Sequence, residues 1–423
     1  MRTFRWVLGT VAIAVAVASF GVFAPAGAQS AGAPGVTAKA IKVGGVVGKT
    51  NPTGRPYENG FIGAQAYFDL VNAKGGVNGR KIQIVAKYDD QSRDSKDISA
   101  VRSLVEEDKV FAVLPVETQN FAGADYLVQK GTPTFGWNIN TQWSKGPNLF
   151  GAGGSYICMT CPIMAPTFIA EQQNAKKVGL LAYGSSPSST QCSEGQEAAF
   201  DKWGPKVAFK DRSLSFGFSA NDVSAAVQAV KDNGVDFIAT CMDVNGESNF
   251  NKALKQSGVT DVKYYAPEGY DSGVLKELGK DLDGFTFVID FLPFENAKES
   301  KNMQLFIKEM KKRGIEPGEH SLVGWNSAQL LVEGLKKVGK NVTQKGVVDA
   351  INSITDWTYE GTRPTVDWTT AHGPFPVGSQ SCAAYVEVRD GKFVPVYNQP
   401  GKPYVCFDQN PYPATLTPAY SAS

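Results

Sequence analysis

Short apolar strands alternate with amphipathic helices along the first part of this chain, and this order constrains the fold more than any other feature. Residues 41–47 are an apolar run bounded by turn residues, as expected for a strand buried on both faces. Residues 57–71 then space apolar side chains three or four positions apart, which makes one helical face apolar. The cycle repeats through strands at 81–88 and 110–116. This spacing predicts right-handed crossovers and a parallel sheet.

The same alternation returns after the glycines at 151–154, which predicts a second sheet. A chain of 423 residues also exceeds what one hydrophobic core usually supports. The predicted fold class is α/β: two doubly wound parallel-sheet lobes joined by a three-strand hinge. The expected bounds are 40–150 and 292–358 for lobe one, 151–291 and 359–410 for lobe two, and 411–423 for a C-terminal tail.

The N-terminus has the pattern of a secretory signal peptide. Arg2 and Arg5 precede an uncharged stretch at 6–24, and Ala-Gly-Ala at 26–28 is a small-residue cleavage site. Residues 1–28 are expected to be removed, and residues 29–39 to be a disordered linker. An uncleaved membrane anchor is the alternative, since the stretch has nearly the length that spans a bilayer. No cysteine follows it, so we expect an exported protein without a lipid anchor, in the periplasm or cell-envelope space, or secreted.

Charge and histidine content exclude several function classes. Removal of the two N-terminal arginines lowers Lys plus Arg from 42 to 40 against 41 acidic residues, so the mature chain is nearly neutral. Such neutrality, without a basic stripe, argues against a nucleic-acid partner. The chain has two histidines, His320 and His372, and neither follows a predicted strand beside a nucleophile, so we interpret each as a surface or hinge residue. We expect no enzymatic activity, metal or cofactor.

Six cysteines in an exported chain predict disulfides. The expected pairs are Cys158 with Cys161, Cys192 with Cys241, and Cys382 with Cys406. The second pair lies at two strand ends on one edge of a sheet, and the third brackets a predicted terminal hairpin and should pair across it. The first pair has the spacing of a redox-active pair at a helix start. Because the strand order around it is not that of a thioredoxin, we interpret it as a local structural disulfide.

Several motifs of the first hundred residues stand in a recognisable order. An Asn-Pro-Thr-Gly turn at 51–54 follows the first strand, residues 72–81 carry two glycines before the second strand, and that strand ends in Asp89 and Asp90. This run is similar to the first lobe of the branched-chain amino acid-binding proteins. The resemblance implies a type I periplasmic binding protein: a receptor that closes on a small-molecule solute and presents it to an ABC importer permease. It also implies a monomer that is peripheral to the membrane through the transporter.

Ligands of open α/β sheets bind beyond the carboxyl ends of the strands, so the loops there supply the candidate residues. They are Tyr57, Thr118, Gln119, Trp137, Asn138, Asn140, Tyr156, Asp243 and Glu268. Pro267 to Gly269 resembles the family motif whose glutamate takes the ammonium group of the ligand, and a solvated loop glutamate is the alternative for Glu268. The loop of Thr118 and Gln119 resembles the hydroxyl-bearing loop that binds the ligand carboxylate.

Two departures from the family pattern limit the ligand prediction. Trp137 stands where the family has small residues, and it either lines the pocket or fills core beneath the hinge. Cys192 stands where many relatives have a cleft tyrosine before Glu-Gly. The expected solute is an amino acid of branched-chain type, with an amide, a urea-like compound or an aromatic acid as alternatives. A secreted sensory binding protein without transport is the other function class.

Overall fold

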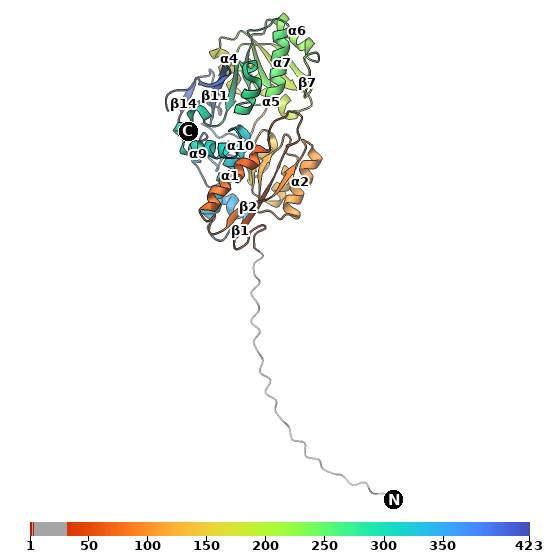
Figure 1. Ribbon diagram of the computed structural model, residues 1–423, viewed down its shortest axis with the longest axis vertical. Coiled ribbons are helices and arrows are strands. Elements are labelled where there is room, and N and C mark those ends of the chain that lie inside the picture. Colours follow the sequence, from red (N-terminus) through yellow and green to blue (C-terminus); the bar gives the residue numbers. More distant parts are fainter. Residues whose placement is uncertain (2, 4–31) are drawn as a thin grey trace. The chain divides into compact units, whose positions relative to one another are not determined.

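The computed structural model describes Met1, Thr3 and residues 32–423, of which 33–423 form one compact unit (Figure 1). The predicted signal peptide thus falls almost wholly outside the described residues. The linker prediction is wrong from residue 33 onward, because Ala33 and Val36 pack against the core and the Gly35 carbonyl accepts a hydrogen bond from the Lys42 amide at 2.8 Å. Within these ranges no helix combines the length and apolarity needed to cross a bilayer.

Lobe one is built on a five-stranded parallel sheet with the order β2-β1-β3-β4-β5. Its strands are β1 (Ala40–Val47), β2 (Lys81–Asp89), β3 (Ala112–Glu117), β4 (Thr134–Gly136) and β5 (Leu149–Gly151). Its helices are α1 (Asn59–Ala73), α2 (Asp94–Glu106), α3 (Ala124–Lys130), α10 (Glu319–Val338) and α11 (Gln344–Ile351), with a 3-10 turn η1 (Thr141–Lys145).

Alternate side chains of the central strands face opposite layers of helices, as a sheet buried on both sides requires. Ile41 and Val43 of β1 pack in one cluster with α1 and α10. Val46 of β1 and Val113 of β3 pack in another with α2 and α3. Figure 1 shows α1 and α10 side by side on one face of this sheet and α2 on the other.

Lobe two is built on a nine-stranded sheet, order β14-β13-β11-β10-β9-β8-β6-β7, with β12 paired to β11. Its parallel strands are β6 (Lys177–Tyr183), β7 (Lys206–Leu214), β8 (Phe237–Cys241), β9 (Lys263–Ala266) and β10 (Phe285–Ile289). Its antiparallel strands are β11 (Gln380–Arg389), β12 (Lys392–Val396), β13 (Tyr404–Asp408) and β14 (Ala419–Ser421). Its helices are α4 (Met164–Gln172), α5 (Pro187–Trp203), α6 (Ser224–Asn233), α7 (Val244–Gln256) and α8 (Ser272–Leu278), with η2 (Gly279–Leu282).

The parallel strands of the two lobes share one topology. In chain order, the second strand of each set flanks the first, and the third, fourth and fifth follow on the other side. The order therefore reverses between β1 and β3 in lobe one, and between β6 and β8 in lobe two. Ligands of doubly wound folds bind at such switch points. The loops that follow these four strands are thus the parts of the fold best placed to form a site.

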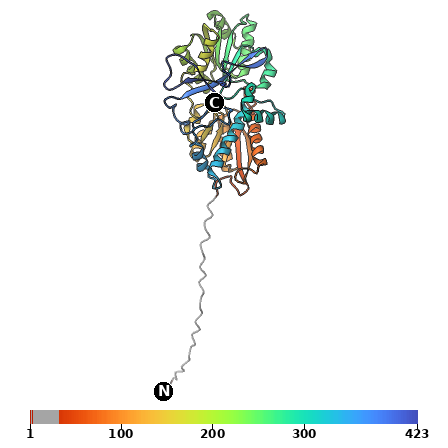
Figure 2. The same ribbon diagram turned by 90° about the vertical axis from the view of Figure 1, so that its left-hand side faces the viewer.

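Three connections join the lobes: one follows β5, one follows β10 and contains η3 (Phe294–Glu299), and one spans 352–379. Helix α9 (Lys301–Lys312) follows the second connection, and the views in Figures 1 and 2 place it between the two sheets. Phe306 of α9 packs edge-on against Trp325 of α10, with ring centroids 5.7 Å apart, and stacks on Phe294 at 6.1 Å. One continuous hydrophobic cluster runs from the strands of lobe two through α9 to Ala66 on α1 and Trp325 on α10.

All three predicted disulfides are present in the structure. The location of the third was wrong: Cys382 and Cys406 face each other on β11 and β13, whereas the hairpin pairs β11 with β12. The end of the chain, expected as a tail, contributes β14, which pairs with β13 and completes the edge of the sheet.

Candidate functional site

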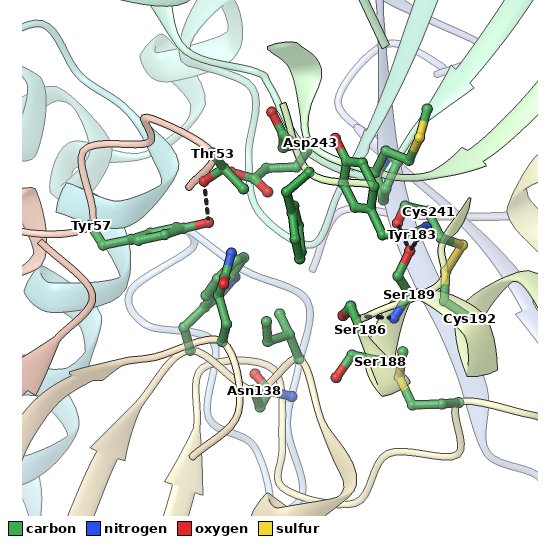
Figure 3. Close-up of a pocket in the computed structure, with 18 of the residues that line it drawn as sticks. Thr53, Tyr57, Asn138, Tyr183, Ser186, Ser188, Ser189, Cys192, Cys241 and Asp243 are labelled. Atoms are coloured by element: carbon green, nitrogen blue, oxygen red, sulfur yellow. Dashed lines mark hydrogen bonds between the residues drawn. A yellow bond between two sulfur atoms is a disulfide. The ribbon is translucent and has the colours of Figure 1, made fainter. Parts of the chain in front are cut away.

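A cavity of about 260 Å³ lies where the switch points of the two lobes face each other (Figure 3). Six of the nine candidate ligand-binding residues line it: Tyr57, Gln119, Trp137, Asn138, Asp243 and Glu268. Apolar and aromatic side chains make up much of the remaining wall, namely Ile139, Ile157, Met159, Tyr183, Phe216 and Met242. A small solute with an apolar body matches this lining.

The other three candidates lie away from this cavity. Thr118 is buried, and its Oγ1 accepts a hydrogen bond from the Phe121 amide at 3.1 Å. Asn140 is also buried and donates through Nδ2 to the Gln119 carbonyl at 3.3 Å. Tyr156 packs edge-on against Phe375 and lines a separate cavity near the third connection. Thr118 and Asn140 therefore shape the loops behind the wall.

The loop after β1 is organised by one side chain, that of Asn51. Its Oδ1 accepts hydrogen bonds from the amides of Thr53 and Arg55, each at 3.1 Å, and its Nδ2 donates to the Gly48 and Arg55 carbonyls at 2.8 Å. Gly54 supplies a left-handed conformation with φ of 68° that few other residues adopt. This turn extends to lobe two, where Asn245 Nδ2 donates to the Thr53 carbonyl at 2.7 Å.

Arg55 and Glu268 form an ion pair between the lobes. Arg55 Nε lies 2.9 Å from Glu268 Oε1, and the exposed fractions of the side chains are 4% and 13%. His320 Nε2 lies 3.6 Å from the same oxygen. Glu268 therefore lines the cavity as a mostly buried, paired carboxylate rather than a solvated one. Burial would raise the pKa of Glu268, but the nearby His320 ring and the charge of Arg55 outweigh it and lower the pKa.

His320 is buried within this cluster, so its interpretation as a surface or hinge residue was wrong. Its Nδ1 lies 2.9 Å from Oε2 of Glu117, the last residue of β3, and both side chains are almost inaccessible. Burial lowers the pKa of His320, but the hydrogen bond with Glu117 and the nearby Glu268 carboxylate outweigh it and raise the pKa to about 10. Burial raises the pKa of Glu117 to about 7, against the effect of His320. At neutral pH His320 is thus a buried imidazolium between two carboxyl groups.

Trp137 lines the cavity on the side of lobe one and is only partly buried. It therefore lies at the pocket rather than in the core beneath the hinge. Its Nε1 donates to Glu319 Oε1 at 3.0 Å. Its ring tilts against Tyr57 with centroids 5.4 Å apart and meets the His320 ring edge-on at 5.0 Å. These contacts hold the indole as a flat wall, a surface suited to aliphatic or aromatic groups.

The wall from lobe two is formed by the start of α5 and the end of β8 (Figure 3). Helix α5 begins at Pro187, with Ser186 as its N-cap. Cys192 therefore lies within the helix, and its disulfide to Cys241 is part of the cavity wall. Ser189 Oγ donates to the Cys241 carbonyl at 2.5 Å, which further ties the helix start to the strand.

Asp243 lies beside these groups as the N-cap of α7. Its side chain accepts from the Asn245 amide at 3.0 Å and from the Tyr183 hydroxyl at 2.6 Å. Burial raises the pKa of Asp243. Among the residues that the structure describes, no group of His, Cys, Asp or Glu has the arrangement of a metal site.

Sequence reasoning missed several residues of the site: Thr53, Arg55, Tyr183, Ser186, Glu319 and His320. The Asn-Pro-Thr-Gly turn was a usable signal for the first two. Ser186 before Pro187 was a signal for the helix start, because serine is a common N-cap and proline favours the first helical position.

The comparison with protein families agrees with this architecture. A family profile described as "Periplasmic binding protein" matches residues 40–392. The chain belongs to the periplasmic binding protein family. A curated relative of this periplasmic binding protein is the leucine-, isoleucine-, valine-, threonine- and alanine-binding protein of Pseudomonas aeruginosa. The two are 23% identical over 327 residues, which are 76% of this chain and 84% of the relative.

Solved structures of similar fold hold different ligands. The branched-chain amino acid transporter substrate-binding protein of Streptococcus pneumoniae, in complex with isoleucine, has a TM-score of 0.70 at 18% identity and covers 84% of this chain and 98% of its own. An ABC transporter solute-binding protein of R. palustris, in complex with benzoate, has a TM-score of 0.65 at 20% identity. The match covers 84% of this chain and 95% of the R. palustris chain. The fold of this binding protein is therefore that of the type I class.

Proposed function

We propose that this protein is the extracytoplasmic receptor of an ABC importer and that it binds an amino acid with an apolar side chain between its lobes. The observation that carries the proposal is the cavity between the two switch points, which places a carboxylate, Glu268, beside an apolar wall. Oε1 of Glu268 is held by Arg55 and His320. No hydrogen bond involves Oε2 within the described part of the chain, so this oxygen is the acceptor that we assign to the ammonium group.

The carboxylate of the solute is assigned to the start of α5. Ser186 and Ser188 line the cavity there, and the first amides of a 17-residue helix favour an anion. The side chain of the solute would then lie against Trp137, Ile139 and Met159. This assignment moves the carboxylate from the Thr118 loop of lobe one to lobe two, because the Thr118 side chain does not line the cavity.

Calorimetric titration of solute-free protein tests the proposal. The exported protein is unfolded in urea without reductant, dialysed and refolded, which removes any solute carried through purification and keeps the disulfides. Leucine is compared with 4-methylpentanoate, which lacks the ammonium group, and with 3-methylbutylamine, which lacks the carboxylate. Binding of leucine at least tenfold tighter than either analogue is expected. Equal binding of leucine and 4-methylpentanoate would remove the ammonium role from Glu268.

A second candidate solute is a carboxylic acid or an amide without an ammonium group. The charge of Glu268 is already compensated by Arg55 and His320, so a ligand cation is not required for neutrality. The benzoate complex of a structural relative is compatible with such a ligand. Benzoate, benzamide and urea therefore belong in the same titration, and tight binding of one of them without binding of leucine would favour this candidate.

The remaining assignments follow the same proposal. We infer that residues 1–28 are removed on export, that the lobes comprise 40–150 with 292–358 and 151–291 with 359–410, and that the receptor acts as a monomer without catalytic activity. N-terminal sequencing of the exported protein tests the removal of residues 1–28. Light scattering tests the monomeric state. A permease and an ATPase encoded beside this chain would separate a transport receptor from a sensory one.

A further inference from the structure

Polar contacts between protein groups join the lobes across the cavity. Arg55 and His320 of lobe one both contact Oε1 of Glu268 in lobe two. Asn245 of lobe two donates to the Thr53 carbonyl of lobe one. Closed binding proteins usually owe such contacts to a solute that bridges the halves. Here protein groups of the two lobes also contact one another directly.

The ion pair is also buried enough to matter energetically. An arginine remains charged at any pH that a folded protein meets, so a guanidinium that is 4% exposed needs a partner. Glu268 is that partner across the cleft, and its hydrogen bond with Arg55 Nε, at 2.9 Å, is charge-assisted. His320 adds a second positive charge, and its other ring nitrogen lies 2.9 Å from Glu117. The cluster thus contains two cations and two carboxyl groups.

The loop that presents Arg55 is rigid rather than adaptable. Asn51 makes hydrogen bonds with both the amide and the carbonyl of Arg55, so the backbone at this residue is fixed before any contact with lobe two forms. His320 is fixed as well, by Glu117 and by the edge-on contact with Tyr57 at 4.6 Å. The Arg55 backbone and the His320 ring are therefore held in place on lobe one, and Glu268 is the group that reaches both side chains when the lobes meet.

We propose that Arg55 and His320 are positioning residues that bind Glu268 across the cleft, so that the lobes close on each other in the absence of solute. The inference rests on the proposed function only in that the cleft is the solute site. Closure without solute holds Oε1 of Glu268 against lobe one and leaves Oε2 for the solute. A solute then enters a largely preformed site instead of bringing the lobes together.

Small-angle X-ray scattering of the refolded, solute-free protein tests this inference. The scattering curve of the wild type is expected to match the curve calculated from the closed structure. Arg55→Met and Glu268→Gln are each expected to increase the radius of gyration, and the double variant is expected to increase it no further than the larger single effect. Residues before 33 are the same in all variants, so differences report on the lobes.

Arg212→Met is the matched control. Arg212 forms an ion pair with Glu197 at 2.6 Å and hydrogen bonds with Ser193, all within lobe two, so its loss removes polar contacts inside one lobe and none between the lobes. Its radius of gyration is expected to equal that of the wild type. Arg55→Lys keeps the charge and is expected to restore part of the closed population. A structural role for Arg55 would lower stability but would not change the radius of gyration or be rescued in this way.

Two results would overturn the inference. One is a solute-free wild type whose curve fits only a more open arrangement, a result that needs no variant and therefore holds even if Arg55→Met fails to fold. The other is an unchanged radius of gyration in Glu268→Gln. Neither measurement uses a solute, so a failure of the proposed amino acid to bind in calorimetry leaves this test intact, and the reverse also holds.

Discussion

The stability of the protein should depend strongly on the pairing of Arg55 with Glu268. Replacing Glu268 by Ala takes the ion-pair partner from Arg55, whose side chain is 4% exposed in the closed structure, and takes one of two carboxyl partners from His320. Removing one partner of a buried ion pair costs about 3–5 kcal/mol because the other charge stays unpaired. Since the lobes are expected to open in this variant and water then reaches Arg55, we expect the lower end, about 3 kcal/mol of unfolding free energy.

A double-mutant cycle separates this pairing from the packing of each side chain. Arg55→Met keeps most of the side-chain volume and removes the cation, and Glu268→Ala with Arg55→Met removes both charges. The double variant is expected to lose less stability than the sum of the two single losses, by about 1–3 kcal/mol, because no buried charge of the pair remains. Urea denaturation of the solute-free proteins, followed by tryptophan fluorescence, gives each free energy.

The cycle has a clear contrary outcome. Exposed ion pairs contribute only about 0–1 kcal/mol. Single losses within about 0.5 kcal/mol of the wild type, or losses that simply add in the double variant, would show that water or an open cleft solvates these groups in the folded protein. The same cycle built on Arg212 and Glu197, which are 22% and 26% exposed, supplies the reference for a less buried pair.

Three further predictions concern other parts of the site. His320→Gln should be less stable than the wild type, with the whole difference present below about pH 6.5 and lost as pH rises through about 10, because the pKa of His320 is raised in the folded state. Denaturation between about pH 6 and 10.5 measures this difference, and a constant difference would contradict an imidazolium at this position. Trp137→Phe should abolish most of the fluorescence change on solute binding, and an unchanged signal would place the solute elsewhere. Loss of the Cys192–Cys241 disulfide, which closes 49 residues, should cost about 4 kcal/mol and weaken solute binding, whereas loss of the Cys158–Cys161 disulfide, with a separation of 3, should cost roughly 2 kcal/mol; equal losses in urea denaturation of the paired Cys→Ser variants would contradict this.

Much of the fold could be predicted because its signals are local. Strand β1 was predicted at 41–47 and β2 at 81–88, each within one residue of its bounds in the structure, since hydrophobic periodicity marks such elements directly. The disulfide partners were also predictable, because the cysteines of each pair lie near predicted strand ends or close together in sequence. The expected location of Glu268, in a loop after a strand, placed it at the cavity.

The charge cluster was not predictable, because its contacts join residues far apart in the chain. Arg55 and Glu268 are separated by 213 residues, and His320 and Glu117 by 203. No local sequence pattern predicts that two loops from different lobes will meet. A single histidine beside a glutamate on a helix is also typical of an ordinary exposed helix face. The packing of α10 against β3 is what buries His320, and that packing is a property of the assembled lobe.

The hydrophobic cluster that passes from lobe two through α9 to α1 and α10 has a consequence for how the protein denatures. Phe306 and Trp325 belong to it although they lie outside the sheet of lobe two. Separating the lobes at this side would expose both aromatic rings to water, so neither half retains a complete interior of its own. The chain should therefore melt in a single cooperative transition, and a fragment that contains only one of the two sheets should aggregate rather than fold.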